Sequence, residues 1–176
     1  MLNKNSIIGI ISRFRNLKSK ILYRINPIKE SRRLGVKIGK NCRLVGFVNW
    51  GSEPYLIKIG NHVSITTSKF ITHDGGLWVF RNKKPEIDFF SPVIIGSNVF
   101  IGMDCIIMPG TVIGDNVVIG TGSIVKGKLE SNSVYAGVPA KKIKSLNDYE
   151  NGIAKKTFET KKLSIKQKKE FLLKKF

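Results

Sequence analysis

Two histidines are the residues best suited to acid–base chemistry near neutral pH. His73 stands in the run Thr72-His73-Asp74-Gly75-Gly76, just before a stretch rich in glycine and aromatic residues. This position makes His73 a candidate general base, and an exposed loop histidine is the alternative. His62 follows Gly60-Asn61 and is interpreted as an ordinary surface residue. Two histidines are too few for a three-histidine zinc site, so the sequence predicts no metal.

Charged and aromatic residues follow His73 closely in the sequence. Asp74 is a candidate for orienting the imidazole or an acceptor molecule, with a turn-forming carboxylate as the alternative, and Asp88 is a second acidic candidate. Trp78 offers a flat face of the kind that suits a sugar ring, or it packs within the loop. Arg81 is a candidate for binding a phosphate or carboxylate, or it is a solvated loop charge. We therefore expect the loop of residues 75–91, next to His73, to determine the acceptor.

A period of six residues organises the chain beyond this region. Neither the period of a helix nor that of a plain strand gives this pattern, and a fixed short repeat is typical of a solenoid. In a hexapeptide coil each unit forms one flat side of a triangle, and its aliphatic residue points to the axis. Glycine follows four of these residues at the corner, where it tolerates unusual backbone angles. The repeated positions are Ile95, Ile101, Ile107, Ile113, Ile119 and Val125.

The same register runs upstream through Ile59, Ile65 and Ile71, and it returns at Ile95 after four units of six. Residues 75–91, the excursion loop, lack the repeat. A loop that leaves a solenoid and re-enters it in phase lies at the surface and often binds a ligand. The sequence therefore predicts an all-β solenoid, a parallel β-helix, over residues 34–135.

Helical extensions are predicted on both sides of the coil. Residues 1–33 are expected to form a basic amphipathic lead, and residues 136–176 a basic C-terminal extension with weaker helical spacing. The apolar stripe of the lead is formed by Ile7, Ile10, Ile11, Phe14, Leu17, Ile21, Ile25 and Ile28.

The net charge of +19 on 176 residues is confined to the two ends. Residues 1–45 hold twelve basic side chains and one acidic, residues 141–176 hold twelve and four, and residues 46–140 hold seven of each. A nucleic-acid-binding domain would carry the charge on its body, so no nucleic acid is expected. Three functions remain open for the charged ends: they keep the protein soluble, they bind an acidic glycan acceptor, or they bind an anionic membrane surface. We favour the membrane, because stripe and charge coincide between Ile7 and Ile28.

No run of about twenty apolar residues is present, so the sequence predicts no transmembrane helix. Cys42 and Cys105 are too few for a disulfide framework. We expect the protein to be located in the cytoplasm, or at most to bind peripherally to the inner face of the membrane.

Three stretches carry a resemblance to a known family: residues 96–102 (GSNVFIG), 109–116 (PGTVIGDN) and 136–141 (AGVPAK). They resemble the hexapeptide-repeat acyltransferases, which include maltose, galactoside, xenobiotic and polysaccharide O-acetyltransferases. The resemblance covers residues 34–145 and implies a left-handed coil, a homotrimer with sites between neighbours, and acetyl-CoA as acyl donor. It also implies direct transfer, with His73 as the base at the point where the loop departs.

The resemblance further assigns residues to the donor. Met103 and Thr121 match positions that contact the pantetheine arm, and Lys141 and Lys144 match a basic pair near the 3′-phosphate. The family often has Thr-Lys where this chain has Lys126-Gly127-Lys128, so Lys126 is a candidate with Lys128 as its alternative.

The expected function, which the resemblance implies, is acetyl-CoA-dependent O-acetylation of a sugar hydroxyl in surface polysaccharide biosynthesis. One alternative is N-acetylation of a nucleotide-linked amino sugar. Another is a non-catalytic β-helix scaffold that binds membrane or partners through its basic ends.

Overall fold

The computed structural model describes Ser19 and residues 21–176. It divides into two compact units, one ending at Leu146 and one running from Asn147 to Phe176. The predicted apolar stripe between Ile7 and Leu17 lies outside the described residues. Within the described part of the chain, no helix is long and apolar enough to cross a membrane.

Short strands make up most of the first unit. The strands of the described residues are β1 (Lys37–Ile38), β2 (Arg43–Val45), β3 (Ile57–Ile59), β4 (Val63–Thr66), β5 (Lys69–Phe70), β6 (Val93–Ile95), β7 (Val99–Ile101), β8 (Ile106–Ile107), β9 (Val112–Ile113), β10 (Val117–Ile119), β11 (Ile124–Val125), β12 (Lys128–Leu129), β13 (Ser133–Gly137) and β14 (Ala140–Ser145). Besides the helical residues 21–25, the helical segments of the described residues are α2 (Pro27–Arg33), α3 (Leu146–Ala154), α4 (Ile165–Lys175) and the 3₁₀ turns η1 (Pro54–Leu56) and η2 (Gly75–Phe80).

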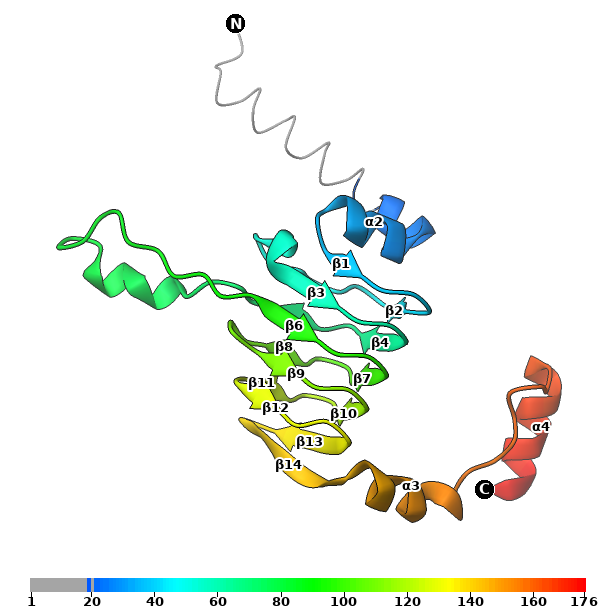
Figure 1. The fold of residues 1–176 in the computed structure, drawn as a ribbon. Helices are drawn as coiled ribbons and strands as arrows, with labels where there is room; N and C mark the ends of the chain where they lie inside the picture. Colours follow the sequence, from blue (N-terminus) through cyan, green and yellow to red (C-terminus); the bar gives the residue numbers. More distant parts are fainter. Residues whose placement is uncertain (1–18, 20) are drawn as a thin grey trace, which may run out of the picture. The chain divides into compact units, whose positions relative to one another are not determined.

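These strands form the three walls of a coil (Figure 1). Sheet A has the order β1-β3-β6-β9-β12, sheet B the order β14-β13-β10-β7-β4-β2, and sheet C the order β11-β8-β5. The chain visits sheets A, B and C in turn, and neighbouring coils pair in parallel. We call the edge where the chain passes from sheet C to sheet A the C–A edge, and the preceding edge the B–C edge.

Three hexapeptide units make one coil. Val99 pairs with Val117 and Ile106 with Ile124, so equivalent residues lie 18 positions apart. Between β3 and β6 the spacing doubles, because Ile57 pairs with Val93. The additional residues leave the coil at the C–A edge as the excursion loop, which projects from the coil in Figure 1.

The predicted aliphatic positions form the core. Ile95, Ile101, Ile107, Ile113, Ile119 and Val125 are each at most 2% exposed. The prediction that Ile71 points inward is wrong. Phe70 is the buried residue, and it pairs with Ile107. Because Ile65 pairs with Ile101, the corner before β5 is one residue shorter than the corner before β8.

A helical lead covers the first coil. Residues 21–25 are helical, and Asn26 caps α2 by accepting a hydrogen bond from the Lys29 backbone N–H at 2.9 Å. Trp50 Nε1 donates to Ser31 Oγ of α2 at 2.9 Å, so the helix is held against the core. Of the predicted stripe, Ile21 and Ile25 are exposed to solvent.

The C-terminal extension begins as a strand. β14 pairs antiparallel with β13, with Val134 opposite Lys144, and closes the end of sheet B. Helical structure starts only at Leu146, with α3 followed by α4. The segment from residue 136 therefore contributes to the coil before it becomes helical.

Candidate functional site

His73 lies at the base of the excursion loop, three residues after the end of β5 of sheet C. The two ends of the loop pair with each other there. His73 forms an antiparallel bridge with Phe90, and the Ser91 backbone N–H donates to the Thr72 carbonyl at 2.8 Å. Thr72 is fully buried and belongs to the coil. The rigid coil and the paired loop ends therefore fix the backbone of His73.

Glu53 is the partner of the His73 imidazole. The distance from His73 Nδ1 to Glu53 Oε2 is 3.0 Å, and Thr72 Oγ1 donates to the same carboxylate oxygen at 2.7 Å. The Glu53 side chain is 13% exposed, whereas that of His73 is 41% exposed. One side of the imidazole thus faces a shielded carboxylate while the ring remains accessible from solvent.

The electrostatics of Glu53 favour its ionised form. The hydrogen bond from Thr72 is the main cause that lowers the pKa of the Glu53 carboxyl from its ordinary value, and burial acts in the opposite direction. The hydrogen bond and charge interaction with His73 lower this pKa further. The carboxylate is therefore available to accept a hydrogen bond from Nδ1–H of His73 and to stabilise an imidazolium.

Glu53 was not predicted from the sequence, although the sequence carries a signal for it. The hexapeptide register breaks between Leu44 and Ile59, which marks a second departure from the coil. Asn49 bridges in parallel to Lys69, so the residues that follow Asn49 occupy the C–A edge one coil before His73. Two irregular corners stacked on one edge bring together residues 20 positions apart.

A cleft of about 320 Å³ surrounds the imidazole, and it gathers the residues predicted to be catalytic or to bind the acceptor. It is lined by His73, Glu53, Asp74, Trp78, Arg81, Asp88 and a few neighbours. Trp78 is 75% exposed and presents an open aromatic surface. The cleft therefore combines an acid–base pair with an aromatic wall.

Two of these residues also hold the excursion loop in shape. The Asp74 carboxylate accepts from the Gly76 backbone N–H at 2.8 Å and caps η2, while Glu53 contacts the imidazole. Arg81 donates to the carbonyls of Pro85 and Ile87 at 2.5 and 3.0 Å and to Asp88 Oδ1 at 3.2 Å. The guanidinium thus binds its own loop.

The residues predicted to contact the donor fall on other parts of the coil. Met103 and Thr121 follow β7 and β10, so they stack on the B–C edge, where the Gly122 N–H donates to the Met103 carbonyl at 2.8 Å. Lys126 follows β11 and lies on the C–A edge, the edge that carries His73. Lys141 and Lys144 lie on β14, opposite Ala136 and Val134. Sheet C separates the two edges, so one chain does not bring all these residues together.

His62 has a structural position. Its φ is +55°, a left-handed conformation that Asn98 and Asn116 adopt at the equivalent corners. Its Nδ1 lies 2.8 Å from Asn98 Oδ1, and Asn98 in turn donates to Asn116 Oδ1 at 2.8 Å. His62 therefore begins a ladder of side-chain hydrogen bonds that joins successive coils.

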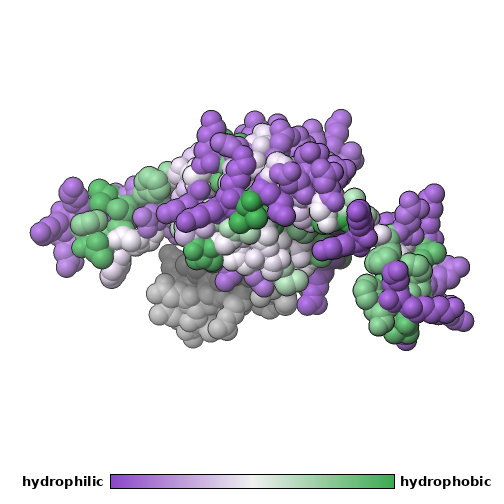
Figure 2. All heavy atoms as spheres, turned by 90° about the horizontal axis from the view of Figure 1, so that it is seen from below, coloured by the Kyte–Doolittle hydropathy of each residue, from purple (hydrophilic) through white to green (hydrophobic). Residues whose placement is uncertain are grey.

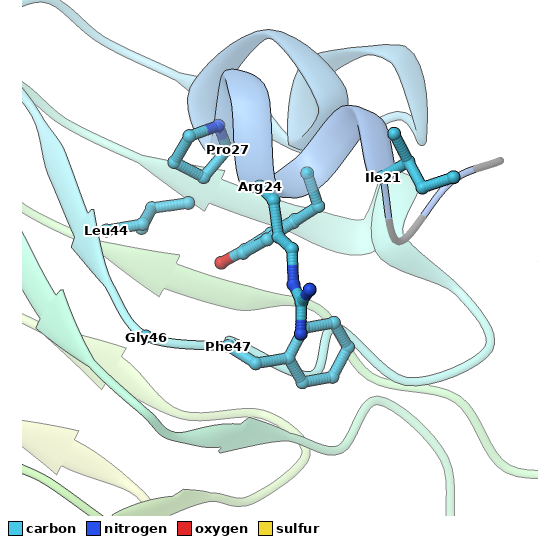
Figure 3. Close-up of a pocket in the computed structure, with 7 residues that line it drawn as sticks. Ile21, Arg24, Pro27, Leu44, Gly46 and Phe47 are labelled. Atoms are coloured by element: carbon cyan, nitrogen blue, oxygen red, sulfur yellow. The ribbon is translucent and has the colours of Figure 1, made fainter. Parts of the chain in front are cut away.

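A larger hollow of about 770 Å³ lies between the helical lead and the first coil (Figure 3). Its lining is mostly apolar, with Ile21, Leu44 and Phe47 around the side chain of Arg24. The Tyr23 hydroxyl accepts from the Val48 N–H at 3.0 Å, and burial raises the pKa of this phenol. No acid–base pair is present in this hollow among the described residues. The described residues also hold no group of three His, Cys, Asp or Glu side chains arranged to bind a metal ion.

Comparison with known proteins identifies relatives. The family described as bacterial transferase hexapeptide (six repeats) matches residues 92–127. Protein CapG of Staphylococcus aureus is 50% identical over 148 residues, which are 82% of this chain and 86% of CapG. The putative lipopolysaccharide biosynthesis O-acetyl transferase WbbJ of Escherichia coli strain K12 is 38% identical over 100 residues, 52% of this chain and 51% of WbbJ.

The fold has a counterpart of known structure, a galactoside acetyltransferase in complex with coenzyme A. It has a TM-score of 0.52 and 26% identity, and the match covers 85% of this chain and 86% of that one. The repeat match, the extent of the similarity to CapG and this shared fold together show that the chain belongs to the bacterial hexapeptide-repeat transferase family and is an acyltransferase.

Proposed function

We propose that the protein transfers an acetyl group from acetyl-CoA to a sugar hydroxyl, with His73 as general base. The observation that carries this proposal is the contact between His73 Nδ1 and Glu53 Oε2 within the cleft. A hydroxyl is a weak nucleophile until its proton is removed, and an oriented imidazole performs that task near neutral pH.

The contact with Glu53 selects the tautomer of His73 that the reaction needs. Nδ1–H donates to the carboxylate, so Nε2 keeps its lone pair. Nε2 takes the proton of the acceptor hydroxyl as that oxygen forms a bond to the acetyl carbonyl carbon and the carbon–sulfur bond breaks. His73 then returns the proton to the departing thiolate. Glu53 stabilises the transient imidazolium, and no enzyme nucleophile is required.

The acceptor class is supported by the chemistry of the cleft and by the relatives. Trp78 supplies an exposed flat face, and Asp74 and Asp88 supply carboxylates that accept hydrogen bonds from sugar hydroxyls. The names of WbbJ and of the galactoside enzyme refer to lipopolysaccharide and to a galactoside. We assign Arg81 a positioning role for the excursion loop, and we place the reaction in surface polysaccharide biosynthesis.

The donor is proposed to bind between protomers of a homotrimer. Met103 and Thr121 lie on the B–C edge, whereas His73 and Lys126 lie on the C–A edge of the same chain. A site that uses both groups needs the B–C edge of a neighbouring copy. Lys141 and Lys144 are exposed on β14 and suit a phosphate as point charges. Acetyl-CoA supplies the activated thioester.

Two further features belong to this proposal. The coil is left-handed, as the family resemblance implies. The reaction takes place in the cytoplasm, and this location is supported by Cys42 and Cys105, which are both free thiols.

An acceptor panel tests the proposed function. Thiol release from acetyl-CoA is measured with free sugars, nucleotide-linked amino sugars and glycans, and each product is treated with mild base, which cleaves an ester but leaves an amide. We expect release with a sugar or glycan and a base-labile product. A base-stable product on an amino sugar would instead show N-acetylation. Failure of every acceptor would favour the scaffold function.

A further inference from the structure

The C-terminal unit, Asn147–Phe176, combines strong positive charge with exposed apolar side chains. Between Lys155 and Lys175 the chain has nine lysines but only two acidic residues, Glu159 and Glu170. None of these lysines pairs with a carboxylate within the described part of the chain. The charge of this segment therefore faces solvent uncompensated.

The apolar residues of α4 gather on one face. Ile165 is 92% exposed and Leu173 is 71% exposed. With Leu172, Lys168 and Lys169 they line an open hollow of about 430 Å³, as expected from helical spacings of three, four and seven residues. Figure 2 shows green hydrophobic atoms of this unit next to purple hydrophilic ones. The face thus carries aliphatic side chains with ammonium groups beside them.

The opposite face of α4 is already packed within its own unit. The rings of Phe158 and Phe171 lie 5.6 Å apart, and Lys175 Nζ stands 5.7 Å from the centre of the Phe158 ring. Ser164 begins α4 with a capping box, in which it exchanges hydrogen bonds with Gln167. Local contacts therefore form the helix, while Ile165 and Leu173 stay exposed on the other face and Leu172 is half-buried beside them.

We propose that this face binds the surface of an anionic lipid bilayer, with α4 lying in the plane of the interface. Such a surface matches both the charge and the apolar side chains of this face, because lipid phosphates attract the lysines and the boundary of the acyl chains accepts the aliphatic side chains. An acidic polymer such as a nucleic acid would satisfy the charge but leave the apolar face in water. The sequence-based expectation of a membrane contact concerned residues 1–33, most of which lie outside the described residues; the present proposal concerns α4, near the other end of the sequence. This inference does not depend on the proposed acetyl transfer.

Vesicle co-sedimentation of the full chain tests the proposal. Vesicles of phosphatidylcholine alone are compared with vesicles that also contain phosphatidylglycerol, at low and high salt. We expect binding to the anionic vesicles that falls as salt rises, and little binding to phosphatidylcholine. Failure to bind anionic vesicles at low salt would overturn the proposal.

Matched variants locate the binding surface. Lys166→Gln, Lys168→Gln and Lys169→Gln together should weaken binding at least about tenfold, since each lysine near the surface contributes about fivefold. The control changes three exposed lysines of the coil, Lys37, Lys58 and Lys69, to Gln and removes the same charge. Equal losses from both triple variants would overturn the assignment to α4.

The apolar contribution is tested separately. Ile165→Ser with Leu173→Ser leaves every charge in place and should remove the binding that persists at high salt. Light scattering of this variant is the accompanying measurement. If the double variant keeps its vesicle binding but changes its oligomeric state, the face joins copies of the chain, and the proposal is wrong.

Discussion

At the scale of single residues, the proposed role of His73 depends on its contact with Glu53. The carboxylate is shielded, accepts from Thr72 at 2.7 Å and lies 3.0 Å from the imidazole. An orienting carboxylate holds the tautomer and stabilises the charge that forms on the base. Glu53→Gln should therefore lower kcat at least about tenfold with a smaller change in KM, as measured by initial rates over a range of acceptor concentrations. An unchanged kcat would show that Glu53 does not assist His73 in the reaction.

The lowered pKa of Glu53 also predicts how stability depends on pH. A carboxyl whose pKa is lower in the folded state stabilises the fold above its unfolded value of about 4.3. That contribution is lost as the pH falls through the lowered folded value. The difference in unfolding free energy between wild type and Glu53→Gln should thus be largest at neutral pH and shrink in acid, as measured by urea unfolding. A difference that grows in acid would contradict the assignment.

The place of His73 at the base of the excursion loop could be predicted from the sequence, whereas its contact with Glu53 could not, for a physical reason. His73 stands where the repeat stops, and the change of pattern is visible in one continuous stretch of sequence. Glu53 lies 20 positions earlier, and the two meet only because both corners fall on the C–A edge. The length of each irregular corner decides that alignment, and a repeat of six does not specify it. The side-chain contacts of Asp74 and Arg81 likewise depend on the shape of the loop.

At the scale of elements, the hexapeptide register predicted the regular coils but not the corner before β5. Phe70 replaces Ile71 as the inward residue because that corner is one residue shorter. Phe70→Ala should lower the unfolding free energy by about 3–5 kcal/mol, because it empties a site that is 1% exposed. Ile71→Ala is the matched control and should cost less, since Ile71 is only partly buried. Urea unfolding at one fixed protein concentration measures both, and a larger loss for Ile71→Ala would contradict this register.

The exposed lysines of strand β14 lead to a prediction about the binding of acetyl-CoA. Lys141→Ala with Lys144→Ala should raise the KM for acetyl-CoA about ten- to a hundredfold, the expected loss for hydrogen bonds to a charged group. The KM for acetyl-pantetheine should stay unchanged, because that donor lacks the 3′-phosphate. Lys142→Ala serves as control, since Lys142 pairs with Glu130 at 2.8 Å. Equal changes in KM for both donors would show that these lysines do not bind the 3′-phosphate.

At the scale of the whole molecule, the proposed donor site, which uses both Met103 and Thr121 and the His73 cleft, requires more than one copy of the chain. The B–C edge with Met103 and Thr121 cannot face the His73 cleft of its own coil, because sheet C lies between them. Light scattering at micromolar concentration should therefore give about three times 19.7 kDa. A stable monomer with full turnover would show that the coil works alone.

The central claim, that His73 is the base of an acetyl transfer, is tested most directly by one pair of variants. Thiol release from acetyl-CoA, with the acceptor that wild type uses, is compared for His73→Ala and His62→Asn. Asparagine is the matched replacement at position 62, because Asn98 and Asn116 fill that corner in other coils with the same positive φ. We predict that His73→Ala lowers kcat about a hundred- to ten-thousandfold while the oligomeric state stays that of wild type, and that His62→Asn keeps nearly full activity. A wild-type rate for His73→Ala, or an equal loss for His62→Asn in a folded protein, would contradict the account.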